Sequence, residues 1–130
     1  MTEQEAADAA LRALSRAERA YTGGTWRPTD ADRALAARLH EALGETVGQL
    51  WERRRPGEVA DPATVPSPLA PPLRTLVDTA AGPLADLTQT VAAYAEAWTP
   101  AGAGPARERQ RVLLLYGQLL AAVLVDDASY

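Results

Sequence analysis

Residues 112–125 read VLLLYGQLLAAVLV and form the most apolar stretch of the chain. Only Gln118 is strongly polar, and Gly117 and the hydroxyl group of Tyr116 are the other interruptions. A helix that is apolar on all sides belongs in a protein core. The stretch is also shorter than the ~20 apolar residues that a membrane span requires. We therefore expect a buried central helix in a small domain.

The composition fits a single folded domain and excludes cysteine chemistry. The chain has 130 residues, of which 47% are hydrophobic and 23% are charged, as is usual for one globular domain. It contains no Cys, so there is no disulfide framework, thiolate metal site or cysteine nucleophile. Lys and Phe are absent too, and Ala, Leu, Arg, Gly and Pro dominate. Because these residues have GC-rich codons, we expect a high-GC, bacterial genome.

Charge indicates where the protein works and what it does not bind. The net charge is −4, which argues against general coating of nucleic acid, because phosphate binding needs a basic surface. Residues 1–21 carry acids where a signal peptide needs bases, and they have no apolar core segment. We therefore expect a cytoplasmic protein.

Helical periodicity extends over most of the chain. Thr2 and Glu5 have the form of a capping box, and Thr29 is the expected N-cap of the next helix. Trp26 lies two residues before a proline and should be extended and pack down from the loop. The pattern predicts an all-α four-helix bundle in one domain, 1–130. The predicted helices cover residues 3–21, 30–55, 72–98 and 105–126.

A long Pro-rich linker and a long helix follow the second predicted helix. Residues 56–71 contain five prolines, which favour extended structure over helix. Apolar residues then recur at alternating steps of four and three, as in a heptad seam: Leu73, Val77, Ala80, Leu84, Leu87, Val91, Tyr94 and Trp98. The register does not slip across Gly82 and Pro83, which would normally break a helix. We therefore predict one Pro-kinked helix over 72–98.

Two runs of arginine form a candidate anion-binding site: Arg53, Arg54, Arg55, Arg107, Arg109 and Arg111. Three of them begin the fourth predicted helix, where they oppose the helix dipole, and such local conflicts tend to mark functional sites. Arginines at a helix N-terminus suit phosphate or carboxylate groups. The alternative is that they pair with acids of a neighbouring helix.

The bundle topology decides whether the two arginine runs meet. Simple up-and-down connectivity would place them at opposite ends of the bundle, and we expect this arrangement. A crossover by the long linker would instead gather all six at one end, together with Glu3, Glu5 and Asp8.

Arg33 and His40 form a second candidate site. They are seven residues apart on the second predicted helix, close to one face of it. An Arg followed after four to six intervening residues by His resembles the catalytic motif of HEPN-type RNases, which are small helical bundles and often dimers. The resemblance implies that Arg33 and His40 would be the catalytic pair. It covers two residues, and Ala34 stands where that family usually has a polar residue. The alternative is a histidine at the rim of the bundle.

No other catalytic arrangement is present. The sequence has no Glu-x-x-His pair of the kind that builds di-iron bundles, and no Gly-rich phosphate loop after a strand. We therefore expect no enzymatic activity, no cofactor and no metal.

An excess of apolar surface carries the leading functional hypothesis. The third and fourth predicted helices offer more apolar surface than one small core needs, and a two-fold homodimer is the most frequent way to bury it. We predict a small non-enzymatic protein that acts through protein–protein contacts, as an adaptor, regulator or complex subunit. The interface candidates are Leu115, Leu119, Trp98 and Tyr94. The alternatives are anion or nucleic-acid binding through the arginines, HEPN-like RNase activity, and binding of a small ligand between helices.

Overall fold

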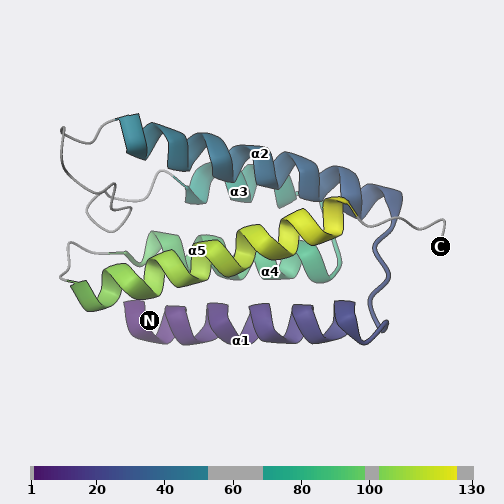
Figure 1. Ribbon diagram of the computed structural model, residues 1–130, viewed down its shortest axis with the longest axis horizontal. Coiled ribbons are helices and arrows are strands. Elements are labelled where there is room, and N and C mark those ends of the chain that lie inside the picture. Colours follow the sequence, from purple (N-terminus) through teal and green to yellow (C-terminus); the bar gives the residue numbers. More distant parts are fainter. Residues whose placement is uncertain (1, 53–68, 99–102, 126–130) are drawn as a thin grey trace.

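Helices account for the regular structure of the described chain, as predicted (Figure 1). The computed structural model describes residues 2–52, 69–98 and 103–125, and these ranges contain no strand. The described helices are α1 (Glu3–Thr22), α2 (Asp30–Glu52), α3 (Ala70–Val77), α4 (Pro83–Glu96) and α5 (Ala103–Leu124). None of them is long and apolar enough to cross a membrane.

Thr2 and Thr29 cap the N-termini of the first two helices, as predicted. At α1 the Glu5 amide donates to Thr2 Oγ1 at 3.1 Å, and Thr2 Oγ1 donates to Glu5 Oε1 at 3.2 Å. At α2 the Asp32 amide donates to Thr29 Oγ1 at 3.1 Å, and the Thr29 amide donates to Asp32 Oδ2 at 2.9 Å. The three bonds from backbone amides satisfy donors that a helix start otherwise leaves open, and those at Thr29 and Asp32 form a reciprocal capping box. Trp26 is buried in the loop between the two helices, also as predicted.

The residues predicted to form one kinked helix form two antiparallel helices. α3 ends at Val77 and α4 begins at Pro83. Arg74 Nη2 donates to Glu96 Oε2 at 2.9 Å, so α3 lies against the last part of α4, and the two helices run in opposite directions (Figure 1). In one continuous helix those two residues would be about 33 Å apart. The prediction of a single Pro-kinked helix over 72–98 is therefore wrong, and the described chain has five helices where four were predicted.

Gly82 explains the reversal. Its φ is 107° and its ψ is −178°, a conformation that residues with a Cβ atom avoid. Pro83 lacks an amide hydrogen and is pre-set for the first turn of a new helix. All but one of the predicted seam residues are nevertheless buried: Leu73, Val77, Leu84, Leu87, Val91, Tyr94 and Trp98. The apolar stripe therefore identified the buried face of each helix but not the direction in which each helix runs.

The ends of the predicted linker and of the last helix shift by a few residues. α3 begins at Ala70 inside the predicted linker 56–71, with Pro71 and Pro72 in its first turn, where a missing amide hydrogen costs no helical bond. Leu69 and Ala70 are already buried. Residues 53–68 lie outside the described chain. The fourth predicted helix, 105–126, corresponds to α5.

The extra reversal sets the direction of α5. α1 and α2 lie at opposite edges of the molecule with α4 and α5 between them, and α3 packs beside α2 and α4 (Figure 1). Arg109 pairs with Glu3 near one end, and Tyr21 Oη donates to the Ala122 carbonyl at 3.3 Å near the other. α5 is therefore parallel to α1 and antiparallel to α2. Its first residues lie at the end of the molecule where α2 finishes, in contrast to the predicted separation.

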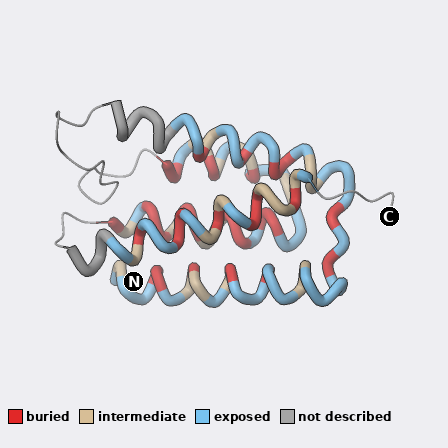
Figure 2. The backbone as a smooth tube through the Cα atoms, in the orientation of Figure 1, coloured by how far each residue is buried: buried red, intermediate tan, exposed pale blue. Residues whose placement is uncertain are grey.

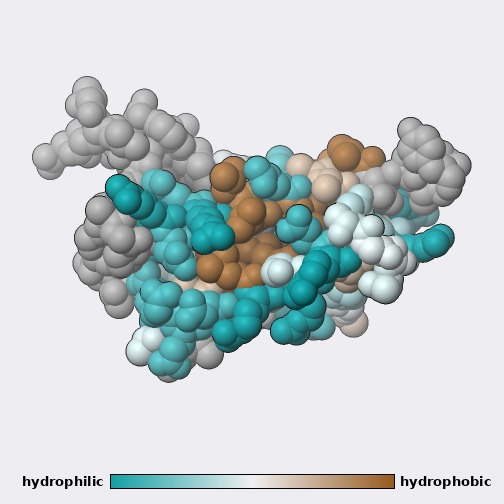
Figure 3. Space-filling model, turned by 60° about the horizontal axis from the view of Figure 1, so that its bottom comes forward, coloured by the Kyte–Doolittle hydropathy of each residue, from teal (hydrophilic) through white to brown (hydrophobic). Residues whose placement is uncertain are grey.

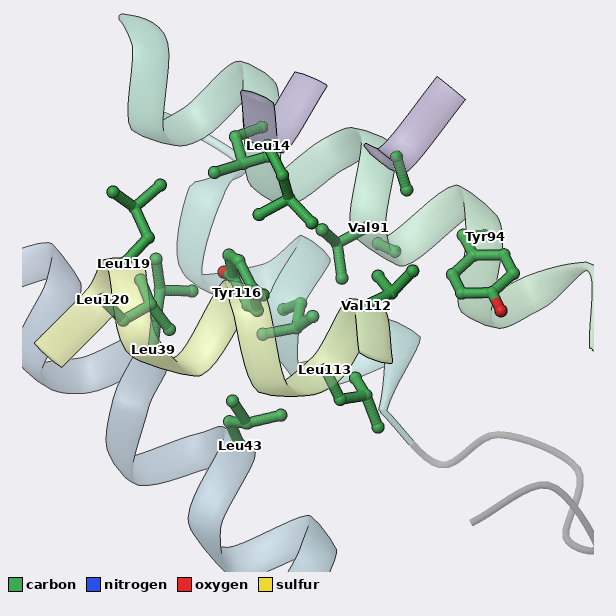
Figure 4. Packing of buried hydrophobic residues seen from close by; sticks show 14 of the residues in the cluster. Leu14, Leu39, Leu43, Val91, Tyr94, Val112, Leu113, Tyr116, Leu119 and Leu120 are labelled. Carbon is green, nitrogen blue, oxygen red and sulfur yellow. The ribbon is translucent and has the colours of Figure 1, made fainter. Parts of the chain in front are cut away.

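The inner side of α5 is the centre of the core (Figure 2, Figure 4). Tyr116 is fully buried, and its hydroxyl lies 2.7 Å from the buried Thr88 Oγ1 of α4. Gly117 faces α2, because a Cβ built on it would lie 3.4 Å from Leu43 Cδ2. The opposite side of α5 is exposed at Arg111, Leu114 and Gln118. The prediction of a buried central helix therefore holds for one side of α5 only.

Candidate functional site

A groove lies between α1 and α5 on the face that Figure 3 shows, where an apolar area is framed by hydrophilic residues. Its volume is about 450 Å³. The apolar residues of its lining include Leu11, Leu14, Leu115 and Leu119, and the polar ones include Ser15, Glu18, Arg111 and Gln118. The two helices that build it are about one hundred residues apart in the chain.

The packing of α1 explains why its leucines face this groove. α1 packs against α4 through short side chains, among them the buried Ala6, Ala10 and Ala17. Leu11 lies on the side of α1 toward α5, where it is only partly buried. The apolar lining is therefore left partly open to solvent. Burial of such a surface by a partner would be favourable, at ~25 cal/mol per Å² of apolar area removed from water.

Leu114 extends the apolar surface beyond the groove. It is 61% exposed on the outer side of α5, and Val125 is 70% exposed. The two are eleven residues apart and thus on nearly the same helical face. A single exposed leucine is ordinary, but a contiguous apolar patch marks an interaction surface. The sequence analysis missed Leu114, although its spacing of three from Arg111 and four from Gln118 places it on the polar side of the helix.

Opposite charges stand toward the two ends of the groove. Arg111 lies in the first half of α5, and Glu18 lies in the last turns of α1. Because Tyr21 contacts Ala122, Glu18 is near the level of Leu119, about 12 Å along the helix axis from Arg111. Both residues are exposed, and neither makes an ion pair with another residue of the described chain.

Arg109 is buried and is not available to an external anion. Its Nε donates to Glu3 Oε2 at 2.8 Å, and its Nη2 donates to Glu3 Oε1. Its guanidinium carbon also lies 5.1 Å from the centre of the Trp98 ring, a favourable cation–π distance. Of the two interpretations of the arginines, an anion-binding site or pairing with acids of a neighbouring helix, the second describes Arg109. Arg107 and Arg111 remain exposed, and Arg53, Arg54 and Arg55 lie outside the described residues.

The four interface candidates occupy different places. Leu115 and the buried Leu119 line the groove. Tyr94 and Trp98 are buried and are not among its lining residues, and their rings are in T-shaped contact at 5.7 Å between centroids. The Tyr94 hydroxyl and Trp98 Nε1 have no hydrogen-bond partner among the residues that the structure describes. Burial, with a smaller effect from the nearby Glu3 carboxylate, raises the pKa of Tyr94 well above its usual value. Tyr94 and Trp98 therefore belong to the core near the start of α5.

Arg33 and His40 are not brought together by a shared contact. Arg33 Nη1 donates to the Pro28 carbonyl at 3.0 Å, and Nη2 contacts Asp30. Both contacts direct the guanidinium toward the start of α2, while His40 is exposed about 10 Å further along the axis. Within the described ranges, no three His, Asp or Glu side chains are grouped closely enough to hold a metal ion.

Comparison with known proteins identifies no family for this chain. No family model matches the chain, and neither the search of curated proteins nor the search of solved structures found a similar one.

Proposed function

We propose that this protein acts through protein–protein contacts, as an adaptor, a regulator or a subunit of a complex, and that it does not catalyse a reaction. The contact surface is the groove between α1 and α5 together with the outer side of α5. The observation that carries the proposal is the apolar lining of the groove together with the exposed Leu114, the next residue to the lining residue Leu115 on α5. An apolar groove between two helices is a common docking place for a helix of a partner.

The extent of this surface favours a protein over a small ligand. Leu114 and Val125 lie outside the groove lining, so an occupant that covers them must be larger than the groove. A stable protein interface buries roughly 800 Å² on each partner. That is about a tenth of the chain's accessible surface of 7654 Å².

Photo-crosslinking in the native host tests the proposal. A photoreactive amino acid replaces Leu114 in one variant and the exposed Arg38 of α2 in a control variant. We expect discrete crosslinked protein adducts from position 114 and none of comparable yield from position 38. Absence of any discrete adduct at position 114 would show that this face does not bind protein.

A further inference from the structure

The charges of the groove suit a partner with the same arrangement of charges. Arg111 lies near one end and Glu18 toward the other, and neither is paired within the described chain. A two-fold axis through the middle of the groove exchanges its two ends. It would therefore bring the arginine of each copy to the glutamate of the other.

We propose that the groove binds a second copy of this chain, with the two α5 helices antiparallel across a two-fold axis. The inference rests on the proposed function and specifies the partner. Interfaces of this kind are self-complementary, because each contact occurs twice. Arg111 of one copy pairs with the partner's Glu18, and Glu18 pairs with the partner's Arg111.

The same geometry assigns a place to Leu114. The midpoint between the levels of Arg111 and Glu18 lies near Leu114 and Leu115. At this level Leu115 lines the groove, and Leu114, the most exposed large apolar side chain within α5, lies beside it on the outer side of the helix. The contact therefore extends from the groove onto Leu114 of each copy. A parallel arrangement of the two α5 helices would instead bring Arg111 toward the partner's Arg111, and like charges oppose each other.

Charge reversal with mixing tests this arrangement. In Arg111→Glu alone, both intermolecular pairs become Glu against Glu, and in Glu18→Arg alone both become Arg against Arg. We expect each variant to dimerise roughly tenfold or more weakly than the wild type in sedimentation experiments at low salt. In an equal mixture of the two variants both pairs are again opposite in charge, so a heterodimer forms. The double variant Arg111→Glu with Glu18→Arg also dimerises.

Controls separate this effect from misfolding and from net charge. Arg38→Glu and Glu45→Arg make the same changes at exposed positions of α2, and both variants should dimerise like the wild type. Circular dichroism should show unchanged helix content for every variant, because Arg111 and Glu18 have no partner to lose within the described chain.

Three outcomes would overturn the inference. If the single variants dimerise like the wild type, Arg111 and Glu18 do not form intermolecular ion pairs. If the mixture of the two variants stays monomeric, the two α5 helices are not arranged antiparallel in the way proposed. A wild-type protein that is monomeric, but that crosslinks from position 114 to a different protein, excludes the second copy while the proposed function stands. If position 114 gives no adduct either, the proposed function fails as well.

Discussion

Arg109 connects three parts of the fold through one side chain. Its guanidinium, on α5, binds the Glu3 carboxylate at the start of α1 and lies over the Trp98 ring just after α4. Arg109 is fully buried, and a buried cation is tolerated only when it is paired and hydrogen-bonded. The pair therefore fixes the ends of these elements relative to one another.

Removal of the Glu3 carboxylate should destabilise the protein strongly. Glu3→Ala leaves a buried cation without its carboxylate, so we expect the free energy of unfolding to fall by about 3 kcal/mol or more. Chemical denaturation measures this change. Glu45→Ala, at an exposed position of α2, should change stability by no more than about 0.5 kcal/mol. Equal effects of the two substitutions would contradict the buried pair.

For the arginines at the beginning of α5, the sequence predicted a contact with an acidic group but not which residue supplies that group. Arginines against the helix dipole indicated that Arg107, Arg109 and Arg111 needed acids or an anion. Which of them is buried depends on the relative position of α1 and α5, about one hundred residues apart. The caps were predictable because Thr2 and Glu5, like Thr29 and Asp32, are three residues apart and interact without help from the rest of the fold.

At the scale of elements, the α3–α4 hairpin shows the limit of periodicity. The seam residues are buried as predicted, but a stripe of period 3.5 gives the buried face of a helix and not its direction. The information on direction lay in Gly82 and Pro83. The continuous register across this pair predicted a single kinked helix. Two helices that face the same core preserve the register equally well.

Two glycine substitutions with opposite expected effects test this explanation. Gly82→Ala forces a residue with a Cβ atom into a φ of 107°, and we expect it to destabilise the protein by about 1–3 kcal/mol. In Gly44→Ala, within α2, the new Cβ atom meets no atom within 4 Å, so higher helix propensity should stabilise the protein by up to about 1 kcal/mol. Thermal denaturation measures both. A neutral Gly82→Ala would show that the reversal does not depend on the glycine conformation.

At the scale of the whole molecule, the hairpin changes what the protein can expose. It buries the apolar surface of residues 73–98 that the sequence analysis assigned partly to an interface. It also makes α5 parallel to α1, and this arrangement creates the groove. Leu115 and Leu119 could be named from the sequence, because they belong to the apolar stretch. Leu11, Ser15 and Glu18 could not, because only the packing of α1 beside α5 adds them to the same surface.

The mass of the protein in solution tests the central claim most directly. Light scattering at micromolar concentration should give twice the chain mass of 13.8 kDa for the wild type. Leu114→Glu, which places a carboxylate of each copy in the apolar part of the contact outside the groove, should give 13.8 kDa with unchanged helix content. A wild type that is strictly monomeric, or a Leu114→Glu variant that remains a dimer, would contradict the account.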